Sequence, residues 1–229
     1  MTLQHSDPPD SAAGQAEARG GPPGRAPSRP RQASEQRILE AAERVFAEQG
    51  FGGASMAAIA AAAGLPKANL HYYFGTKEGL YRAVLANILE LWLHSTDVLT
   101  PERDPAEAIA EYVRAKMGYS RLRPHASKLF ATELLHGAPQ AWDFLAQDVR
   151  QTVEARSVVI RQWIAEGRIA PVDPPHLFFA IWAMTQTYAD FDIQVKAVLG
   201  RDPLDDSGFD EAVAAVVTFA LRACGLPSD

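Results

Sequence analysis

Polar and aromatic side chains gather just after an Ala-rich segment, within residues 55–77 (SMAAIAAAAGLPKANLHYYFGTK). They are Lys67, Asn69, His71 and Tyr72. Gly64 separates them from the alanines, and glycine readily takes the left-handed backbone that ends a helix in a tight turn. The spacing predicts two short helices joined by a turn, the second offering its polar face to a DNA major groove.

Base recognition is expected from Lys67, Ala68 and Asn69, which begin the second short helix. In a helix-turn-helix, this part of the second helix meets the base edges. Lys can donate to guanine O6 and N7, Asn can pair with adenine, and Ala can lie against a thymine methyl group. The alternative for Lys67 and Asn69 is an ordinary solvated polar surface.

Four other side chains are expected to contact the DNA backbone. Ser55 begins the first short helix, where a hydroxyl and free backbone N–H groups suit a phosphate. His71 and Tyr72 lie further along the second helix and are expected to reach phosphate or sugar. Lys77 opens the next helix and is expected to add affinity without sequence choice. The apolar neighbours expected in the core are Ile59, Leu70, Tyr73 and Phe74.

The motif resembles the DNA-binding domain of the TetR family of bacterial transcription regulators, over about residues 34–85. Its matching elements are Ala63-Gly64, Leu70-His71-Tyr72-Tyr73-Phe74 and Thr76-Lys77-Glu78. Two positions depart from the family pattern, because His71 stands where Tyr is usual and Pro66 where Ser is usual. Neither departure removes a DNA-binding surface, but both leave the operator sequence open.

The resemblance implies an all-α protein of two parts. Residues 34–80 are expected to form a three-helix helix-turn-helix domain, and residues 81–229 a larger helical domain for ligand binding and dimerisation. Residues 1–33 are rich in Gly, Pro, Ala, Ser and Arg, which predicts a disordered arm. Arginines near its end give the arm a way to reach DNA: Arg25, Arg29 and Arg31.

Helical periodicity runs through the chain after residue 34, and no strand-like alternation interrupts it. Asp104-Pro105 and Asp173-Pro174 are typical helix starts, whereas Gly167 and Gly200 are typical ends. The nine helices expected are 34–49, 55–62, 66–72, 76–95, 105–121, 125–136, 140–166, 174–199 and 207–224.

Composition limits the class of protein. The 229 residues are 47% hydrophobic, enough for a small and a larger domain. The net charge is −6, and residues 34–80 hold four Lys or Arg against five Glu, so a dimer is expected to supply the phosphate contacts. A single cysteine, Cys224, and the lack of a recognisable signal peptide or long apolar run predict a cytoplasmic protein without membrane segments.

Further stretches resemble the pyrimidine-utilisation repressor branch of the same family. They are ILELWL (88–93), SKLFATELLHGAP (127–139), GRIAPVDPPHL (167–177) and AIWAMTQTYADFDIQVKAVLG (180–200). This resemblance implies a uracil or thymine effector that controls genes of nucleobase catabolism or transport.

The residues of the 174–199 helix support an effector site independently. Trp182 and Gln186 share a face, with Thr185 beside them. An indole can stack on a planar ring, and a Gln amide offers the donor and acceptor that a pyrimidine edge requires. Trp92 is expected to form a second wall. Two further candidates, for which a core position is the alternative, are Phe130 and Tyr188.

A homodimer is expected through the helices at 174–199 and 207–224, whose apolar residues would form a four-helix interface. The residues proposed for it are Phe178, Phe179, Ile181, Val195, Val198, Val213, Val216, Val217 and Phe219. Such a dimer would place two recognition helices in successive major grooves of a pseudo-palindromic operator. Ligand binding would then favour a dimer geometry in which the distance between the two recognition helices does not match successive major grooves. Activation of transcription is an open alternative to repression.

Enzymatic and metal chemistry find little support. Glu133 and His136 have an i, i+3 spacing used in di-metal bundles, but a second such pair is missing. Neither a phosphate-binding Gly-rich loop nor a nucleophile motif occurs, so no cofactor, metal or catalytic residue is predicted. Two alternatives stay open: a TetR-type regulator sensing a different hydrophobic or aromatic ligand, and a helical ligand-binding protein without DNA activity.

Overall fold

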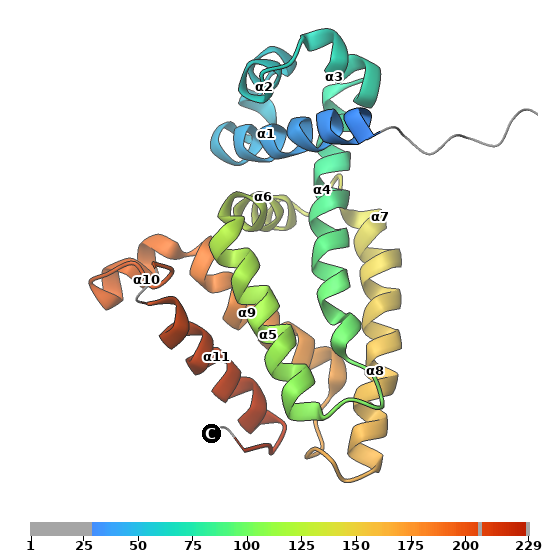
Figure 1. Ribbon diagram of the computed structural model, residues 1–229, viewed down its shortest axis with the longest axis vertical. Helices are drawn as coiled ribbons and strands as arrows, with labels where there is room; N and C mark the ends of the chain where they lie inside the picture. The colour runs from blue at the N-terminus through green and yellow to red at the C-terminus, as the bar shows by residue number, and fades with distance from the viewer. Residues whose placement is uncertain (1–28, 206–207, 228–229) are drawn as a thin grey trace, which may run out of the picture.

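The computed structural model describes residues 29–205 and 208–227, and every regular element in these ranges is helical, as predicted. Three helices lie together at one end of the molecule, and a fourth runs from them along much of its length (Figure 1). They are α1 (Arg29–Gly53), α2 (Met56–Ala63), α3 (Lys67–Phe74) and α4 (Lys77–His94).

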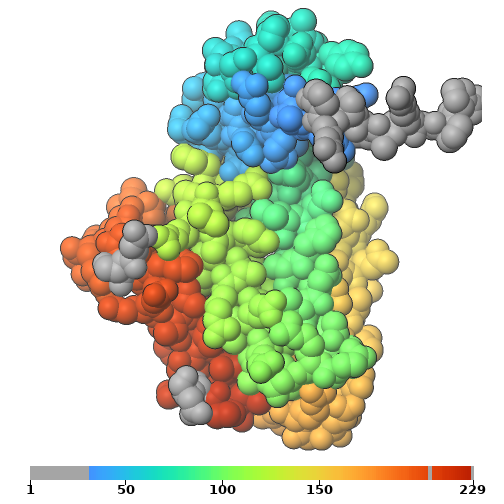
Figure 2. Space-filling view, viewed as in Figure 1, coloured from blue at the N-terminus to red at the C-terminus, as the bar shows by residue number. Residues whose placement is uncertain are grey.

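The remaining helices form the larger C-terminal part. They are η1 (Ser95–Val98), α5 (Pro105–Leu122), α6 (Pro124–Leu135), α7 (Trp142–Phe144), the π-helical turn η2 (Leu145–Val149), α8 (Arg150–Ala165), α9 (Pro174–Asp190), α10 (Asp192–Leu199) and α11 (Phe209–Ala223). Helix α5 packs on α9 and α11, and α6 lies across the top of this bundle against α1. In the space-filling view, the segment around α10 projects from the side of the body (Figure 2).

Side-chain caps and two glycines fix the turns around α2 and α3. The Ser55 hydroxyl oxygen accepts a hydrogen bond from a backbone N–H in the first turn of α2 (3.1 Å). Gly64 ends α2 in the left-handed conformation (φ 62°, ψ 36°). Thr76 caps α4 in the same way as Ser55 caps α2, and a Cβ on Gly79 would lie 2.4 Å from the Phe74 carbonyl oxygen. The turns of the predicted motif therefore follow from local sequence.

The first helix begins earlier than predicted. Residues 29–33, assigned to the disordered arm from sequence, belong to the first turns of α1. Pro30 is compatible with a helix there, because the first-turn N–H that proline lacks would have no partner within the helix. The rest of the predicted arm, including Arg25, lies outside the described residues.

Two predicted helices are subdivided. The helix expected at 140–166 contains the π-helical turn η2 before α8 begins. The helix expected at 174–199 breaks at Phe191 (φ −117°, ψ 33°), which separates α9 from α10. Neither break contains a Gly or Pro that would mark a helix end, which is why sequence alone did not locate them.

Two apolar cores hold the helices together. One joins α1–α4 to α6, and Ile59 and Leu70 are fully buried within it. The other joins α5, α8, α9 and α11 around Tyr112, Trp163 and Phe178. None of the helices in the described ranges is long and apolar enough to span a bilayer. The first core makes α4 and α6 the structural link between the two parts of the chain.

Candidate DNA-binding surface and effector cavity

The outer face of α3 carries most of the side chains predicted to contact DNA. The exposed ones are Lys67, Ala68, His71 and Tyr72. Tyr72 is 73% exposed, and Asn69 is half-buried beside the fully buried Leu70. Leu70 anchors the inner face of the helix, so the polar residues on its outer face have a fixed orientation.

Hydrogen bonds also hold two predicted phosphate contacts in place. Ser55 is exposed at the start of α2, and because its oxygen serves as the cap acceptor, its O–H proton remains available to a phosphate. The His71 Nδ1–H donates to the Gly75 carbonyl (2.9 Å), leaving Nε2 for an outside partner. Both groups keep hydrogen-bonding capacity toward solvent.

Lys77 makes contacts within the domain that its sequence position did not predict. Its ammonium donates to the carbonyl oxygens of Phe51 (2.8 Å) and Ala54 (3.1 Å), and lies 4.5 Å from the centroid of the Phe51 ring. These contacts fasten the start of α4 to the end of α1. Lys77 therefore positions the motif, and because two neutral carbonyls leave its charge and one of its three N–H donors available, the phosphate contact stays a prediction.

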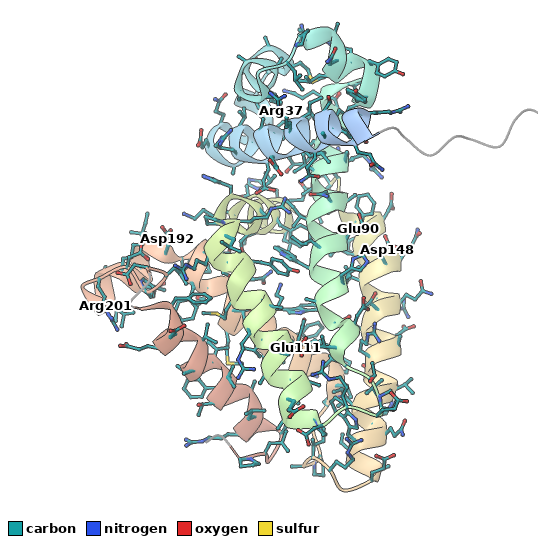
Figure 3. All side chains as sticks on the ribbon, viewed as in Figure 1. Arg37, Glu90, Glu111, Asp148, Asp192 and Arg201 are labelled. Atoms are coloured by element: carbon teal, nitrogen blue, oxygen red, sulfur yellow. The ribbon has the colours of Figure 1, made fainter. Side chains whose placement is uncertain are left out.

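Arg31 joins the same surface from the start of α1. Its guanidinium lies 5.8 Å from the ring centroids of both Tyr72 and Tyr73. Arg37, one turn and a half further along α1, donates to the Ala63 carbonyl (2.8 Å) and ties α1 to the end of α2 (Figure 3). An arginine close to the end of the predicted arm thus lies beside the recognition helix.

A cavity of about 100 Å³ lies among α4, α5, α6, η2 and α9. It is lined by Leu89, Trp92, Leu93, Thr96, Tyr112, Lys116, Phe130, Leu134, Leu145, Val149, Trp182 and Gln186. Most of this lining is apolar or aromatic, with a few polar groups directed inward. Such a lining is typical of sites for small organic ligands.

Four of the six predicted ligand residues line this cavity. Trp92 and Phe130 meet edge to face with ring centroids 5.1 Å apart. The Trp182 indole N–H donates to the Tyr112 hydroxyl (2.7 Å), which fixes the ring as a wall. Gln186 is the fourth predicted residue in the cavity lining, and its side-chain amide forms no hydrogen bond with the described residues.

The other two predicted ligand residues lie elsewhere. Thr185 is fully buried, and its hydroxyl donates to the Ile181 carbonyl of its own helix (2.8 Å). Tyr188 lines a separate surface hollow with Lys128 and Asp192. Both residues fall on the same stretch as Gln186, but the helix turns them away from the cavity.

Lys116 brings an amine into the cavity. The residue is 3% exposed, and Nζ lies 4.2 Å from the centroid of the Trp92 ring. Burial lowers the pKa of Lys116 to about 7, although the charge of Asp190 opposes the shift. Asp190 itself accepts a hydrogen bond from the Ser127 hydroxyl (2.5 Å). The cavity therefore contains a strongly desolvated amine that donates hydrogen bonds but, when protonated, accepts none.

A separate, open groove lies between α4 and the start of α8. Glu90 and Asp148 border it from these two sides (Figure 3), together with Asp97 and Arg156. Its acidic rim suits a hydrated surface more than a buried apolar ligand. We therefore place the candidate effector site in the mainly apolar cavity between α4 and α9.

Family models match both parts of the chain. One, described as bacterial regulatory proteins of the tetR family, matches residues 38–84. Another, described as the C-terminal region of YcdC-like proteins, matches residues 85–227. The chain belongs to the TetR family. It is a DNA-binding transcriptional regulator and not an enzyme, as its sequence predicts.

Curated relatives of this TetR-family protein are regulators too. It is 44% identical over 189 residues to the HTH-type transcriptional regulator RutR of Escherichia coli strain K12, covering 82% of this chain and 89% of RutR. It is 34% identical over 100 residues to the HTH-type transcriptional repressor NicS of Pseudomonas putida, covering 43% of this chain and 47% of NicS.

Solved structures support the same fold. A TetR-family regulatory protein from Rhodococcus RHA1 superimposes with a TM-score of 0.67 at 20% identity, covering 85% of this chain and 98% of that one. AibR in complex with isovaleryl coenzyme A and operator DNA gives a TM-score of 0.61 at 22% identity, covering 81% and 97%. At these identities the likeness concerns the fold alone.

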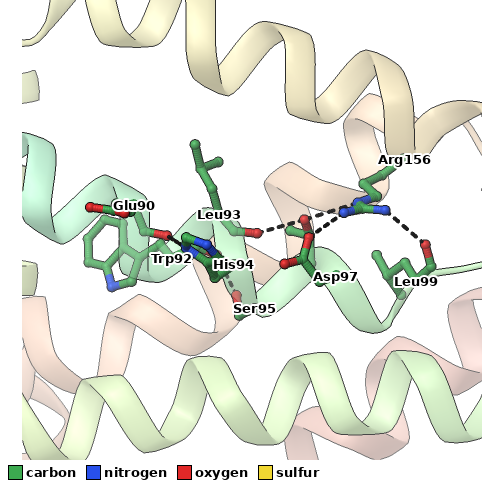
Figure 4. A network of polar contacts seen from close by, with 9 residues as sticks. Glu90, Trp92, Leu93, His94, Ser95, Asp97, Leu99 and Arg156 are labelled. Carbon is green, nitrogen blue, oxygen red and sulfur yellow. Dashed lines mark hydrogen bonds and ion pairs between the residues drawn. The ribbon is translucent and has the colours of Figure 1, made fainter. Parts of the chain in front are cut away.

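A network of polar contacts holds the C-terminal end of α4, which carries Trp92 (Figure 4). The Ser95 hydroxyl donates to the Trp92 carbonyl (2.5 Å), and His94 Nδ1–H donates to the Glu90 carbonyl (2.7 Å). Arg156 of α8 forms an ion pair with Asp97 and donates to the Leu99 carbonyl (3.4 Å). The cavity wall formed by Trp92 is therefore held at its C-terminal side.

Polar contacts also join α6 and the α5–α6 junction to the DNA-binding helices. Arg123 forms an ion pair with the buried Glu43 of α1 and donates to the Asn87 side chain of α4 (3.3 Å). The Tyr81 hydroxyl donates to Glu133 of α6 (3.0 Å). Helices that line the cavity thus also contact the helices that carry the DNA-binding surface.

Sequence reasoning missed Tyr112 and Lys116 as cavity residues. Both lie on the buried stripe of α5, together with Ile109 and Val113. A lysine inside a stripe of apolar residues at helical spacing was the signal that could have revealed the amine.

In the part of the chain that the structure describes, no cluster of His, Cys, Asp or Glu side chains could hold a metal ion. Glu133, considered for that role, instead accepts from two backbone N–H groups and Tyr81.

Proposed function

We propose that the protein is a homodimeric repressor that releases a pseudo-palindromic operator when its cavity binds uracil or thymine. The observation that carries this proposal is the cavity, where aromatic walls surround Gln186 and the amine of Lys116. The similarity to RutR supports a pyrimidine effector and target genes for nucleobase catabolism or transport. Action on DNA agrees with a cytoplasmic location.

The polar groups of the cavity match the edge of a dioxopyrimidine. The Gln186 amide supplies both an acceptor and a donor, and protonated Lys116 supplies donors alone. Uracil and thymine alternate carbonyl oxygens with ring N–H groups, so a carbonyl can face the ammonium while the amide pairs beside it. Cytosine presents an amino group in place of one carbonyl and would leave a polar group unpaired, at a cost of about 1–3 kcal/mol.

Helix α4 offers the path from effector to operator. Its first residue, Lys77, is fastened to α1, and Trp92 near its other end forms a cavity wall. A ligand that favours one position of Trp92 would therefore bias the position of α1–α3. The shift in operator affinity is limited by the ligand's differential affinity for the two positions.

Helices α9 and α11 support the proposed dimer. Among the apolar residues expected at the interface, Phe178, Ile181 and Val216 are buried inside the protomer. Phe179 and Phe219 are more than half exposed, and alanines on the same two helices are exposed beside them. Covering this apolar face with a second copy would space two α3 helices for successive major grooves.

Calorimetric titration of the full chain with uracil, thymine, cytosine and small aromatic acids tests the effector class. Uracil and thymine should bind, and each should release a DNA fragment from the region upstream of the protein's own gene. Binding of an aromatic acid but of neither pyrimidine would favour a TetR-type regulator with a different ligand. A monomer that binds no DNA from this region would contradict the repressor.

A further inference from the structure

Lys116 differs from every other lysine of the chain. Lys128 and Lys196 form ion pairs with Asp192 (2.8 and 3.5 Å), Lys77 is bonded to two carbonyls, and Lys67 is exposed. Lys116 is 3% exposed, and within residues 29–205 and 208–227 its amine forms no hydrogen bond or ion pair. The amine is therefore buried against the Trp92 ring, without a hydrogen bond or ion pair among these residues.

The groups around this amine leave it available for chemistry. Trp92 of α4, Phe130 of α6 and Gln186 of α9 face the same cavity and are uncharged. Asp190 of α9 is the carboxylate whose charge acts on Lys116, but it is bonded to Ser127. Tyr112, one turn earlier on α5, has its pKa raised by burial and stays neutral. Desolvation with no contacting carboxylate favours the neutral amine, whose lone pair is nucleophilic.

We propose that Lys116 is a carbonyl-reactive amine and that the cavity captures small planar aldehydes as an imine. The Nζ lone pair attacks the aldehyde carbon, a C–N bond forms as the C=O π bond breaks, and the carbonyl oxygen takes up one of the two amine protons to give a carbinolamine. Loss of that oxygen with the two amine protons as one water molecule leaves the C=N bond. The step needs no oxidant, reductant or additional reactant.

The shape of the cavity selects the aldehyde. Trp92 and Trp182 offer flat walls, and Leu89, Leu93 and Val149 add apolar surface, so a small aromatic aldehyde fits better than a charged or branched one. An imine on Lys116 would occupy space beside Trp92, on the helix that leads to the DNA-binding surface. This inference goes beyond the pyrimidine proposal and does not depend on it, because it needs only the amine and the cavity.

Reductive trapping tests the inference on the full chain. The protein is incubated with benzaldehyde and cyanoborohydride, and the benzylated residues are located by peptide mass spectrometry. Lys116 should be labelled about tenfold or more faster than any other lysine at pH 7.5, because its pKa lies closest to that pH. Its labelling rate should level off above pH 7–8, while those of exposed lysines keep rising.

Two variants and a smaller probe make the test decisive. Lys116→Met should lose the fast label while keeping the helical circular-dichroism spectrum, and Lys128→Met should keep it. Formaldehyde is tested in parallel, so that restricted entry of benzaldehyde cannot hide a reactive amine. Labelling spread over exposed lysines with both probes, or fast labelling that survives in Lys116→Met, would overturn the inference.

Uracil added before the aldehyde separates this inference from the pyrimidine proposal. Slower labelling of Lys116 in uracil would support both, since one molecule would then block the other. Fast labelling that uracil does not change would leave Lys116 reactive and count against a pyrimidine in the cavity. Uracil binding without labelling of Lys116 would overturn the imine and leave the pyrimidine proposal standing.

Discussion

The DNA-facing surface of α3 and the cavity between α4 and α9 are built in opposite ways. The first takes Lys67, Asn69 and Tyr72 from a single short helix and leaves them outside the core. The second brings together Trp92 and Gln186, far apart in sequence, and places them between helices, with Trp92 buried and Gln186 half-buried. A change on α3 should therefore alter recognition alone, whereas a change in the cavity should alter recognition and stability together.

The largest expected effect is the pH dependence of stability that Lys116 creates. Its pKa is about 7 in the folded chain and ordinarily 10.5, so between these values the unfolded chain binds a proton that the folded chain lacks. The free energy of unfolding should therefore rise with pH across that window, by up to about 1.4 kcal/mol per pH unit from this group. Urea unfolding from pH 6 to 10 measures the slope.

Lys116→Met should remove that slope and make the protein more stable than wild type near pH 7, because the desolvation cost of the buried amine is gone. Lys128→Met is the matched control and should keep the slope, because Lys128 lies partly exposed in an ion pair. Equal slopes in wild type and Lys116→Met would contradict the desolvated amine.

Lys77→Ala separates positioning from DNA contact. Without the ammonium, the carbonyls of Phe51 and Ala54 lose their shared donor, and stability should fall by about 1–3 kcal/mol. Lys67→Ala on exposed α3 should leave the melting temperature unchanged but weaken binding to DNA. If Lys77→Ala melts like wild type and still loses operator affinity, Lys77 contacts phosphate as its sequence position first suggested.

Gln186→Ala should weaken uracil binding by about ten- to hundredfold, since a polar edge of the ligand would lie unpaired in an apolar cavity. Binding to operator DNA without ligand should be retained. The matched control is Gln194→Ala, on the exposed face of α10. Titration calorimetry measures the affinity of both variants for uracil. If Gln186→Ala binds uracil as tightly as Gln194→Ala, Gln186 is not part of the binding site.

Asn69→Ala should have the narrowest effect. A bidentate contact to adenine is worth about 1–3 kcal/mol of discrimination at one base pair. The variant should therefore lose its base preference at that operator position and keep its preferences at the other positions. Binding to a library of operators with single base changes measures this. A uniform loss across the library, with a lower salt dependence, would mean that Asn69 contacts the DNA backbone.

The contrast between the α3 surface and the cavity also explains which parts of the structure could be predicted from the sequence. The motif around α3 was predictable because caps such as Ser55 and the turn at Gly64 act within a few residues. The cavity was predictable only in part. Trp182 and Gln186 share a helix face and were found together, but Lys116 enters from another helix, and its role depends on the packing of α5 against α9.

Local context also explains the misassignments. Thr185 and Tyr188 are neighbours of Gln186 in sequence, but each residue along an α-helix turns by about 100°, so Thr185 faces the core and Tyr188 a surface hollow. Lys77 has the type and position of a phosphate contact, and its additional bonds to the carbonyls of Phe51 and Ala54 become visible only once α1 and α4 are packed. The break at Phe191 has no Gly or Pro to mark it in the sequence.

The most direct test of the account is the reciprocity between the cavity and α3. Operator affinity is measured by fluorescence anisotropy across a uracil series, and uracil affinity by calorimetry with and without saturating operator. Both affinities should fall by the same factor, corresponding to a coupling free energy of about 1–3 kcal/mol. Uracil that binds the cavity while operator affinity stays constant would contradict the proposal that α4 links the two sites.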